Sequence, residues 1–328
     1  MPYCAMFEHG CVIGPSGSVR PCCHFVSDET YKYYDEGWLE YHKQLGEKMK
    51  SSDEFIPECF ECKDCIDRNK PPFMDTYNEQ YAGSEGIVHW DLKINNTCNL
   101  SCKMCDSWSS STWDKIIKNN PDLPEGMKSM YGTTPPQKWH RNISEIFDYL
   151  YFCKRLKFTG GEPFLIPQVD KIINFVVDKE ISKNITLEIT TNGTQDMTNY
   201  VETFSKFHKV ALNISIDAIG KRFEYIRQGA NWSEVEYNIL TIKELTKNID
   251  VTININCTTQ ILNKDHVHEV EQWANKHKLY FNGKSRVWDP ECFSPYALED
   301  KDTKAELLEV LENLDNIHGT DYKEFLDA

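Results

Sequence analysis

Three cysteines fall within the eight-residue segment CNLSCKMC. They are Cys98, Cys102 and Cys105, spaced C-x3-C-x2-C, and they follow an apolar strand-like run at 87–94. Because one residue spans at most ~3.3–3.6 Å, so short a loop can turn three thiolates towards one point. That is one thiolate fewer than a 4Fe–4S cluster or a structural zinc usually takes. The spacing predicts a metal centre with one open corner; a zinc site completed by a distant residue, or three buried structural thiols, are the alternatives.

The same segment resembles the cluster loop of the radical S-adenosylmethionine (radical SAM) enzymes. The resemblance implies that Cys98, Cys102 and Cys105 ligate a catalytic 4Fe–4S cluster, whose fourth iron binds the amino and carboxylate groups of SAM. It also implies that one electron cleaves SAM, giving a 5′-deoxyadenosyl radical that abstracts a substrate hydrogen atom. Met104 stands at the position that contacts adenine in the family, where an aromatic residue is more usual.

Composition limits the class of protein. The chain has 328 residues, is 40% apolar and has a formal charge of 36 − 51 = −15. This length suits one large α/β domain, or one with a small appendage. We find no apolar run long enough to span a membrane, and no signal peptide, so we expect a cytoplasmic protein. The negative charge makes nucleic acid or anionic membrane an unlikely partner, and it slightly favours a neutral or cationic substrate. The 13 cysteines point to metal or redox chemistry rather than disulfides.

Seven of the cysteines lie in the first 66 residues: Cys4, Cys11, Cys22, Cys23, Cys59, Cys62 and Cys65. The segment at 14–17, GPSG, predicts a tight turn between two short strands, which would bring Cys4 and Cys22 together. Cys59 and Cys62 form a C-x2-C pair of the kind that binds a metal or cluster edge.

This pattern, C-x12-G-x4-C followed by C-x2-C, resembles the twitch half of the SPASM auxiliary-cluster domain. The resemblance implies a second 4Fe–4S cluster on Cys4, Cys22, Cys59 and Cys62. In the family the module usually follows the catalytic barrel, whereas here it precedes it. Cys65 could replace Cys62, and Cys11 and Cys23 are also available. A small zinc-stabilised module is the alternative.

From residue 87 onwards, apolar strand-like runs alternate with helical stretches, which predicts β-α units and a parallel sheet. The predicted strands are 87–95, 154–159, 185–191, 209–217, 250–259 and 279–288. The predicted helices are 109–119, 166–180, 197–207, 231–247, 264–277 and 303–317. This order matches the partial (β/α)6 barrel of the radical SAM fold, with a small N-terminal Cys-rich α+β module.

The chain is accordingly divided into three parts. Residues 1–84 form the auxiliary module and linker, 85–300 the barrel, and 301–328 a C-terminal helix packed on it. The polar segment 67–86 is expected to be a surface linker. Residues 120–141, with Trp139, are interpreted as an insertion over the barrel mouth, although ordinary aromatic packing also explains them.

Chemistry in such barrels gathers where strands end. Paired glycines after the second strand let the backbone approach a ligand, and the segment resembles the family's GGEP motif, whose backbone and glutamate bind the SAM amino group. That motif is Gly160, Gly161, Glu162 and Pro163 here. At later strand ends the resemblance implies SAM contacts from Thr191, Asn192, Ser215, Asp217, Arg227 and Asn263. Gln260 would meet adenine or substrate.

The resemblance fixes a mechanism rather than a substrate. We expect oxidation or cross-linking of a peptide or small molecule, with the auxiliary cluster relaying an electron and flavodoxin or ferredoxin as donor. A redox-neutral epimerisation or rearrangement is a second hypothesis, in which Cys292 would donate hydrogen. A zinc-stabilised, non-catalytic binding protein is the third.

Overall fold

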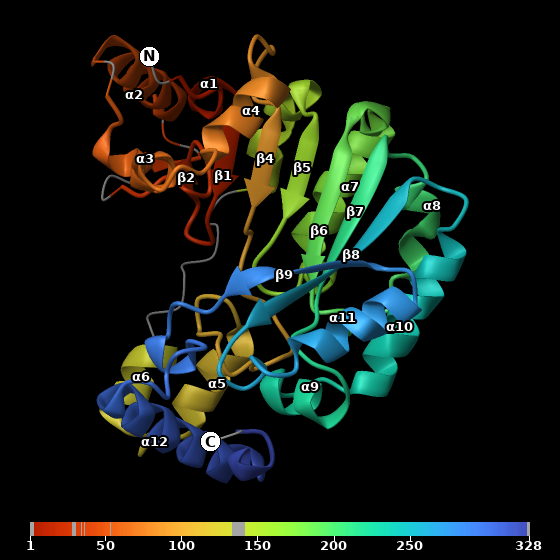
Figure 1. Ribbon diagram of the computed structural model, residues 1–328. Helices are drawn as coiled ribbons and strands as arrows, with labels where there is room; N and C mark the ends of the chain where they lie inside the picture. The colour runs from red at the N-terminus through yellow and green to blue at the C-terminus, as the bar shows by residue number, and fades with distance from the viewer. Residues whose placement is uncertain are drawn as a thin grey trace.

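The computed structural model describes residues 3–27, 31–33, 35, 37–52, 54–132 and 142–326. Within these ranges one nine-stranded sheet has the order β3-β2-β1-β4-β5-β6-β7-β8-β9 (Figure 1). The strands are β1 (Gly10–Ile13), β2 (Ser18–Arg20), β3 (Tyr31–Lys32), β4 (His89–Leu92), β5 (Arg155–Phe158), β6 (Thr186–Thr191), β7 (Lys209–Ser215), β8 (Val251–Thr259) and β9 (Tyr280–Arg286).

Strands β4 to β9 pair in parallel and in sequence order. They correspond to the six strands expected from the apolar runs, so the α/β partial barrel is confirmed, and its sheet stays open. Strand β1 adds a further parallel strand beside β4, while β2 and β3 continue the sheet in antiparallel pairs. The N-terminal cysteine-rich segment therefore shares one sheet with the barrel.

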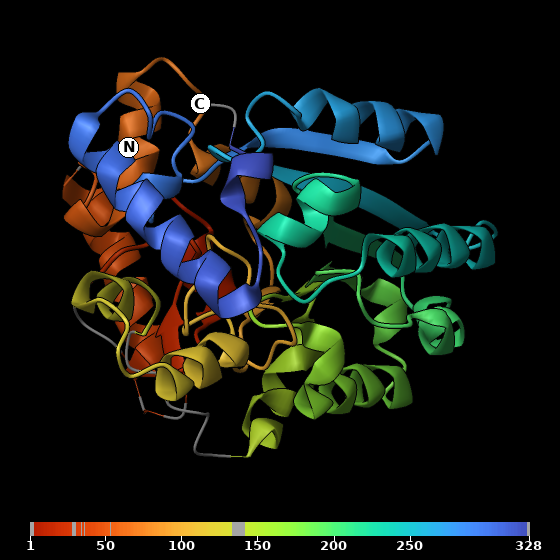
Figure 2. The same cartoon turned by 90° about the horizontal axis from the view of Figure 1, so that it is seen from below.

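The helices are α1 (Met6–His9), α2 (Trp38–Ser52), α3 (Phe60–Asp67), α4 (Phe73–Tyr81), α5 (Ser111–Asn119), α6 (Glu125–Tyr131), α7 (Pro167–Asp178), α8 (Val201–Phe204), α9 (Gly220–Ile226), α10 (Trp232–Leu245), α11 (Val267–Lys276) and α12 (Lys301–His318). Helices α7, α10 and α11 lie along the outside of the curved sheet (Figures 1 and 2). Their buried residues join the alternate apolar side chains of β5 to β8 in the main core.

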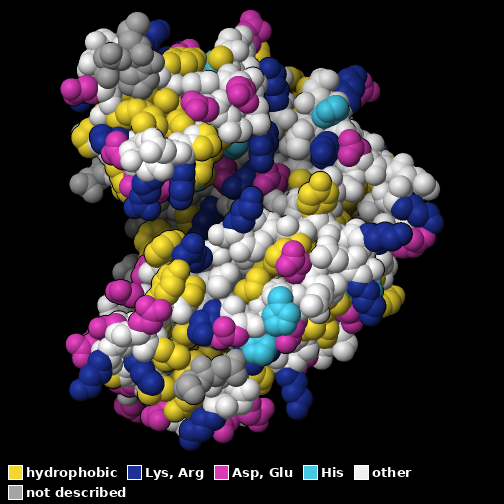
Figure 3. Space-filling view, viewed as in Figure 1, with side chains coloured by type: hydrophobic (Ala, Val, Ile, Leu, Met, Phe, Trp, Pro, Cys, Tyr) yellow, Lys and Arg dark blue, Asp and Glu magenta, His cyan; other side chains and the backbone are white. Residues whose placement is uncertain are grey.

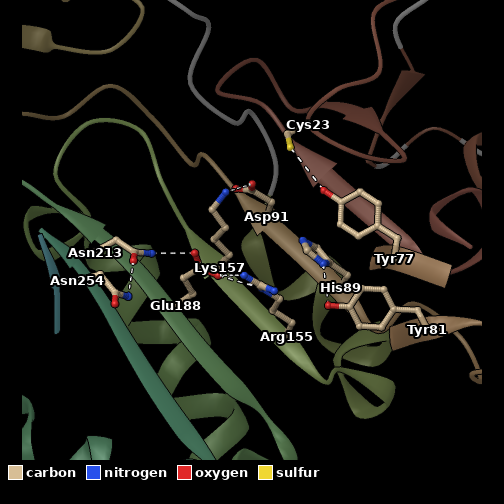
Figure 4. Close-up of polar contacts among 10 residues, drawn as sticks. All are labelled: Cys23, Tyr77, Tyr81, His89, Asp91, Arg155, Lys157, Glu188, Asn213 and Asn254. Carbon is tan, nitrogen blue, oxygen red and sulfur yellow. Dashed lines mark hydrogen bonds and ion pairs between the residues drawn. The ribbon is translucent and has the colours of Figure 1, made fainter. Parts of the chain in front are cut away.

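The strands alternate, because successive side chains point to opposite faces. Leu187 and Ile189 of β6 are fully buried, whereas Glu188 between them faces the other side. That other side carries a row of polar side chains, which Figure 4 shows across β4 to β8. We call it the polar face; it comprises Asp91, Arg155, Lys157, Glu188, Asn213 and Asn254. The surface is hollowed between the N-terminal elements and the α6–α12 end, and Lys and Arg side chains gather along this hollow (Figure 3).

The N-terminal elements have a core of their own. The predicted turn is present: Gly17 N–H donates to the Gly14 carbonyl over 2.8 Å, and β1 and β2 pair on either side. The prediction that 67–86 is a plain surface linker is wrong, because α4 occupies much of it and buries Tyr81. Tyr81 lies in the N-terminal core and Tyr77 packs against it, which the polar composition of the segment did not indicate.

Helix α12 packs against the loop that carries the three cysteines. Lys103, within CNLSCKMC, is 1% exposed; its Nζ lies 3.7 Å from Asp315 Oδ1 and 4.0 Å from the Tyr225 ring centre. Burial lowers the pKa of Lys103 to about 8, although Asp315 opposes the shift. Helix α6 lies in the first half of the predicted 120–141 insertion, while Trp139 falls outside the described residues.

Replacing Asp315 with alanine should lower the free energy of unfolding by about 3–5 kcal/mol, because Lys103 would stay buried without its carboxylate. Anaerobic urea unfolding would measure this loss. The double variant K103M/D315L removes both charges and should recover the part of the loss that comes from the unpaired Lys103, since the hydrogen bonds that Asp315 accepts from Tyr225 and Thr320 are lost in both variants. Equal losses in the single and double variants would show that the ion pair is not the cause.

Candidate active site

The loop with the three cysteines follows β4 and is fixed along its length. Ser101 N–H donates to the Gln228 carbonyl (3.0 Å) and Lys103 N–H to the Ile226 carbonyl (2.9 Å), so the loop lies against the end of α9. From the other side, the Trp113 indole donates to the Cys102 carbonyl (3.1 Å) and the Tyr131 hydroxyl to the Lys103 carbonyl (2.8 Å). The backbone is thus rigid where the thiols project.

Two of the thiols lie close to side chains that directly follow β6 and α9. Asn192 Nδ2 lies 3.8 Å from Cys98 Sγ, and Arg227 Nη1 lies 3.9 Å from Cys102 Sγ. Burial raises the pKa of Cys98 to about 11. A hydrogen bond with Cys105, together with burial, raises the pKa of Cys102, and the same bond lowers the pKa of Cys105.

Among the described residues, no group of three or more His, Cys, Asp or Glu side chains is close enough to hold a metal ion. A 4Fe–4S cluster binds each thiolate through a different iron, so its ligands stand further apart than those of one ion. Three thiols from one short loop fit such a cluster in number and chemistry. A positively charged iron centre would also offset the cost of ionising buried thiols.

The Gly160–Pro163 turn lies beside this loop. Gly160 and Gly161 have φ values of 71° and 52°, which L side chains rarely adopt. A Cβ on Gly161 would stand 2.4 Å from the Thr97 carbonyl oxygen, just before Cys98. The Glu162 N–H donates to that same oxygen over 2.7 Å. Glycine is therefore needed for the β5 turn to touch the cysteine loop.

Glu162 is fully buried and receives hydrogen bonds from the neighbouring β6 end. Its carboxylate accepts from the Thr191 hydroxyl (2.8 Å), the Asn192 N–H (2.7 Å) and the Phe164 N–H (3.2 Å). Burial nevertheless raises the pKa of Glu162 to about 7. The carboxylate therefore suits a ligand that brings a positive charge.

Glu162 should make unfolding pH-dependent. Its pKa is raised on folding, so its contribution is complete below about pH 4.5 and is lost as the pH rises through 7. Between pH 5.5 and 7.5 we expect the wild type to lose about 2 kcal/mol relative to E162Q. Anaerobic urea unfolding of both proteins, without SAM, would measure this difference; a difference that stays constant with pH would contradict it.

Asp217 and Arg227 form a buried ion pair, with Arg227 Nη2 2.8 Å from Asp217 Oδ2. Asp217 is 0% exposed, accepts from the Thr258 N–H (2.9 Å), and its backbone carbonyl accepts from Asn263 Nδ2 (2.7 Å). Through Arg227, which lies 3.9 Å from Cys102 Sγ, this buried pair contacts the cysteine loop. Ser215 remains half-buried at the end of β7.

Met104 is half-buried, and its sulfur lies 4.0 Å from Gln260 Nε2. The structure thereby joins the loop to the end of β8. Sequence reasoning missed two residues here. Asn99 accepts from Asn192 Nδ2 (3.0 Å), and the Lys93 side chain crosses Gly160. Adjacency to Cys98 could have indicated Asn99, whereas only the sheet register places Lys93.

Four of the N-terminal cysteines lie around one cavity. This cavity is lined by Cys4, Cys22, Cys59 and Cys62, and Cys65 is not among its lining residues. Its other lining residues are mostly apolar, including Met6, Phe7, Phe25, Met49, Phe55 and Met74. Burial, together with the charges of neighbouring thiols, raises the pKa of Cys4 and of Cys59 to about 12. Four thiols around one mostly apolar cavity fit a cluster ligated by four cysteines.

The remaining cysteines differ in surroundings. Cys11 of β1 and Cys292 are completely buried, and burial raises the pKa of both. Cys23 is exposed, 3.9 Å from the Tyr77 hydroxyl, and projects towards the polar face (Figure 4).

Comparisons with known proteins agree with this geometry. Residues 92–274, more than half of the chain, match the family model of the Radical SAM superfamily. An uncharacterized protein of Methanocaldococcus jannaschii is 25% identical over 209 residues, covering 62% of this chain and 63% of the relative. A GTP 3′,8-cyclase of Clostridium botulinum is 25% identical over 59% of this chain and 54% of its own. The chain thus spans less than two thirds of either relative.

Solved structures give weaker likenesses. Native anSMEcpe with bound AdoMet is 20% identical, with a TM-score of 0.42 over 61% of this chain and 51% of its own. Streptococcus suis SuiB bound to S-adenosylmethionine is 14% identical, with a TM-score of 0.40 over 87% and 54% of the two chains. In the described part of this chain, no helix is both long and apolar enough to cross a membrane.

Proposed function

The chain belongs to the radical SAM superfamily, and from this premise we propose that it reductively cleaves SAM and abstracts a hydrogen atom from a bound substrate. Membership supports an enzyme that uses a 4Fe–4S cluster and SAM. The observation that carries the proposal is that the β5 and β6 ends, with Glu162, contact the loop bearing Cys98, Cys102 and Cys105. When bound, the cluster supplies the electron that splits SAM into methionine and a 5′-deoxyadenosyl radical.

In this proposal the chain ligates the cluster, orients SAM and excludes water from the site. Cys98, Cys102 and Cys105 ligate the cluster. The SAM ammonium binds the Gly160–Pro163 turn and Glu162, whose buried carboxylate forms no ion pair with any described residue. Arg227, paired with Asp217 and next to Cys102, keeps positive charge beside the thiolates.

The other predicted residues complete the SAM pocket. Thr191 and Asn192 bind the ribose or methionine part, and Ser215 is available at the next strand end. Met104 and Gln260 bind adenine, and Asn263 holds the strand ends in place.

We further propose that Cys4, Cys22, Cys59 and Cys62 ligate an auxiliary cluster that relays an electron during an oxidation or cross-link. The four thiols around one cavity support this choice over Cys65. An external one-electron donor such as flavodoxin or ferredoxin would reduce the catalytic cluster. The substrate is a peptide or a small molecule.

A redox-neutral epimerisation is the second candidate, and one observation favours it. Such a reaction needs a thiol that returns hydrogen to the substrate radical. Cys292 is 0% exposed, whereas Cys23 is exposed beside the polar face. If the reaction is redox-neutral, Cys23 is the better donor.

EPR spectroscopy of the reduced, reconstituted protein tests the proposed arrangement. SAM should alter the signal of the loop cluster, because its open iron gains two ligands, and leave that of the auxiliary cluster unchanged. In the variant C98A/C102A/C105A, only a SAM-insensitive signal should remain. A wild-type signal that does not respond to SAM would contradict the proposal, and bound zinc without sulfide would replace it with a zinc-stabilised module.

A further inference from the structure

The charges on the polar face are mostly paired with one another. Lys157 Nζ lies 2.7 Å from Asp91 Oδ2, and Arg155 Nε lies 2.9 Å from Glu188 Oε2. Asn213 Nδ2 donates to the other Glu188 oxygen over 2.8 Å. Each carboxylate therefore already has a cation, and the row as a whole is close to neutral (Figure 4).

Two cations at the edge of this row have no carboxylate partner. Lys93 Nζ donates to the Ser109 hydroxyl (3.2 Å), and Arg20 Nη1 donates to the Phe25 carbonyl (3.3 Å). Neither forms an ion pair with any residue in the described ranges. Burial lowers the pKa of Lys93, and the Arg20 charge lowers it further, although Asp106, Cys105 and Asp91 oppose both effects. Arg20 of β2 pairs with Val12 of β1, and the Lys93 N–H donates to the carbonyl of Ile13, the next residue of β1 (2.9 Å), so the two cations lie on either side of this strand.

Their position in the fold links the two cysteine sites. Lys93 follows β4, and its methylenes cover Gly160, at the turn proposed to hold SAM. Arg20 ends β2, two residues before Cys22, which lines the N-terminal cavity. A ligand between Lys93 and Arg20 would lie between the two sites.

Two partly buried cations that form no ion pair in the described ranges favour an anion between them, because the anion would form charge-assisted hydrogen bonds with both. We propose that Lys93 and Arg20 bind an anionic group of the substrate, a carboxylate or a phosphate, in the hollow between the two cysteine sites. This inference rests on the proposed function, since it names the substrate class of that site. It replaces the expectation of a neutral or cationic substrate, which came from the net charge alone.

Isothermal titration of the reconstituted, SAM-loaded protein, under anaerobic conditions and at low salt, tests this site. The probes are inorganic pyrophosphate, N-acetylglutamate, and uncharged N-acetylglutamine amide as the reference. At least one anion should bind about tenfold more tightly than the reference, and K93Q and R20Q should each weaken it by about 10- to 100-fold. K93R should restore much of the affinity, and K221Q, an exposed change on α9, should have no effect.

The outcomes separate the alternatives. Pyrophosphate binding alone indicates a phosphate-bearing substrate, and N-acetylglutamate binding alone a carboxylate. The proposal is overturned if neither anion binds more tightly than the uncharged reference. It is also overturned if an anion still binds in both K93Q and R20Q, which would indicate an adventitious ion only. An equal loss of SAM affinity in K93Q would assign Lys93 to the SAM carboxylate and also overturn it. If wild-type protein cleaves SAM but binds neither anion, this inference fails while the proposed function stands.

Discussion

Replacing Cys102 with alanine is expected to reduce SAM cleavage by at least about 100-fold. Cys102 is the most buried of the three loop thiols, and its carbonyl and sulfur both have partners, in Trp113 and Arg227. The variant should lose the iron and sulfide of the loop cluster, measured by chemical analysis after reconstitution, and with them 5′-deoxyadenosine formation.

Cys153 provides the matched control. It is also buried, at 4% exposure, and it precedes β5 without lining either cysteine site. C153A should therefore retain its iron and its SAM cleavage. If C102A cleaves SAM as well as C153A does, the loop does not ligate the catalytic cluster.

Replacing Cys22 with alanine should remove the auxiliary cluster, so that the iron content falls from about eight to about four atoms per chain. SAM cleavage should continue, because the loop cluster and the SAM pocket contain none of the N-terminal residues. Iron and sulfide analysis together with 5′-deoxyadenosine assays would measure both effects. Product formation, once a substrate is known, should fall sharply if the reaction is oxidative.

Cys65 and Cys11 are the controls for this second site. Cys65 lies on α3 next to the C-x2-C pair but outside the cavity lining, and Cys11 is buried in β1. C65A and C11A should keep about eight irons. Loss of iron in C65A but not in C62A would exchange the roles of these two cysteines.

Periodicity was sufficient to predict the parallel strands, because each of β5 to β8 has buried side chains alternating with polar ones. Short elements were not predicted. Helix α9 has only seven residues, so its hydrophobic pattern is too short to distinguish it from a loop. The pairing of β1 with β4 was also missed. Its four residues are all buried, so no alternation shows which neighbour the strand joins.

The site was predictable where spacing limits geometry, as in the three loop cysteines and the glycine pair. The site was not predictable where it depends on the pairing of charged residues that are far apart in the sequence. Asp217 and Arg227 were expected to contact SAM, and their pairing with each other in the interior was not predicted. Lys93 and Arg20 lie 73 positions apart, and only the pairing of β1 with β4 brings their strands close. Net charge likewise says nothing about which charges remain unpaired.

The account depends on reductive SAM cleavage, and one measurement tests it most directly. The protein would be reconstituted anaerobically with iron and sulfide, mixed with SAM and dithionite, and assayed for 5′-deoxyadenosine and methionine. We predict equal amounts of both products, dependent on dithionite and absent in C98A/C102A/C105A. An intact, reducible cluster that yields no 5′-deoxyadenosine would contradict the central claim.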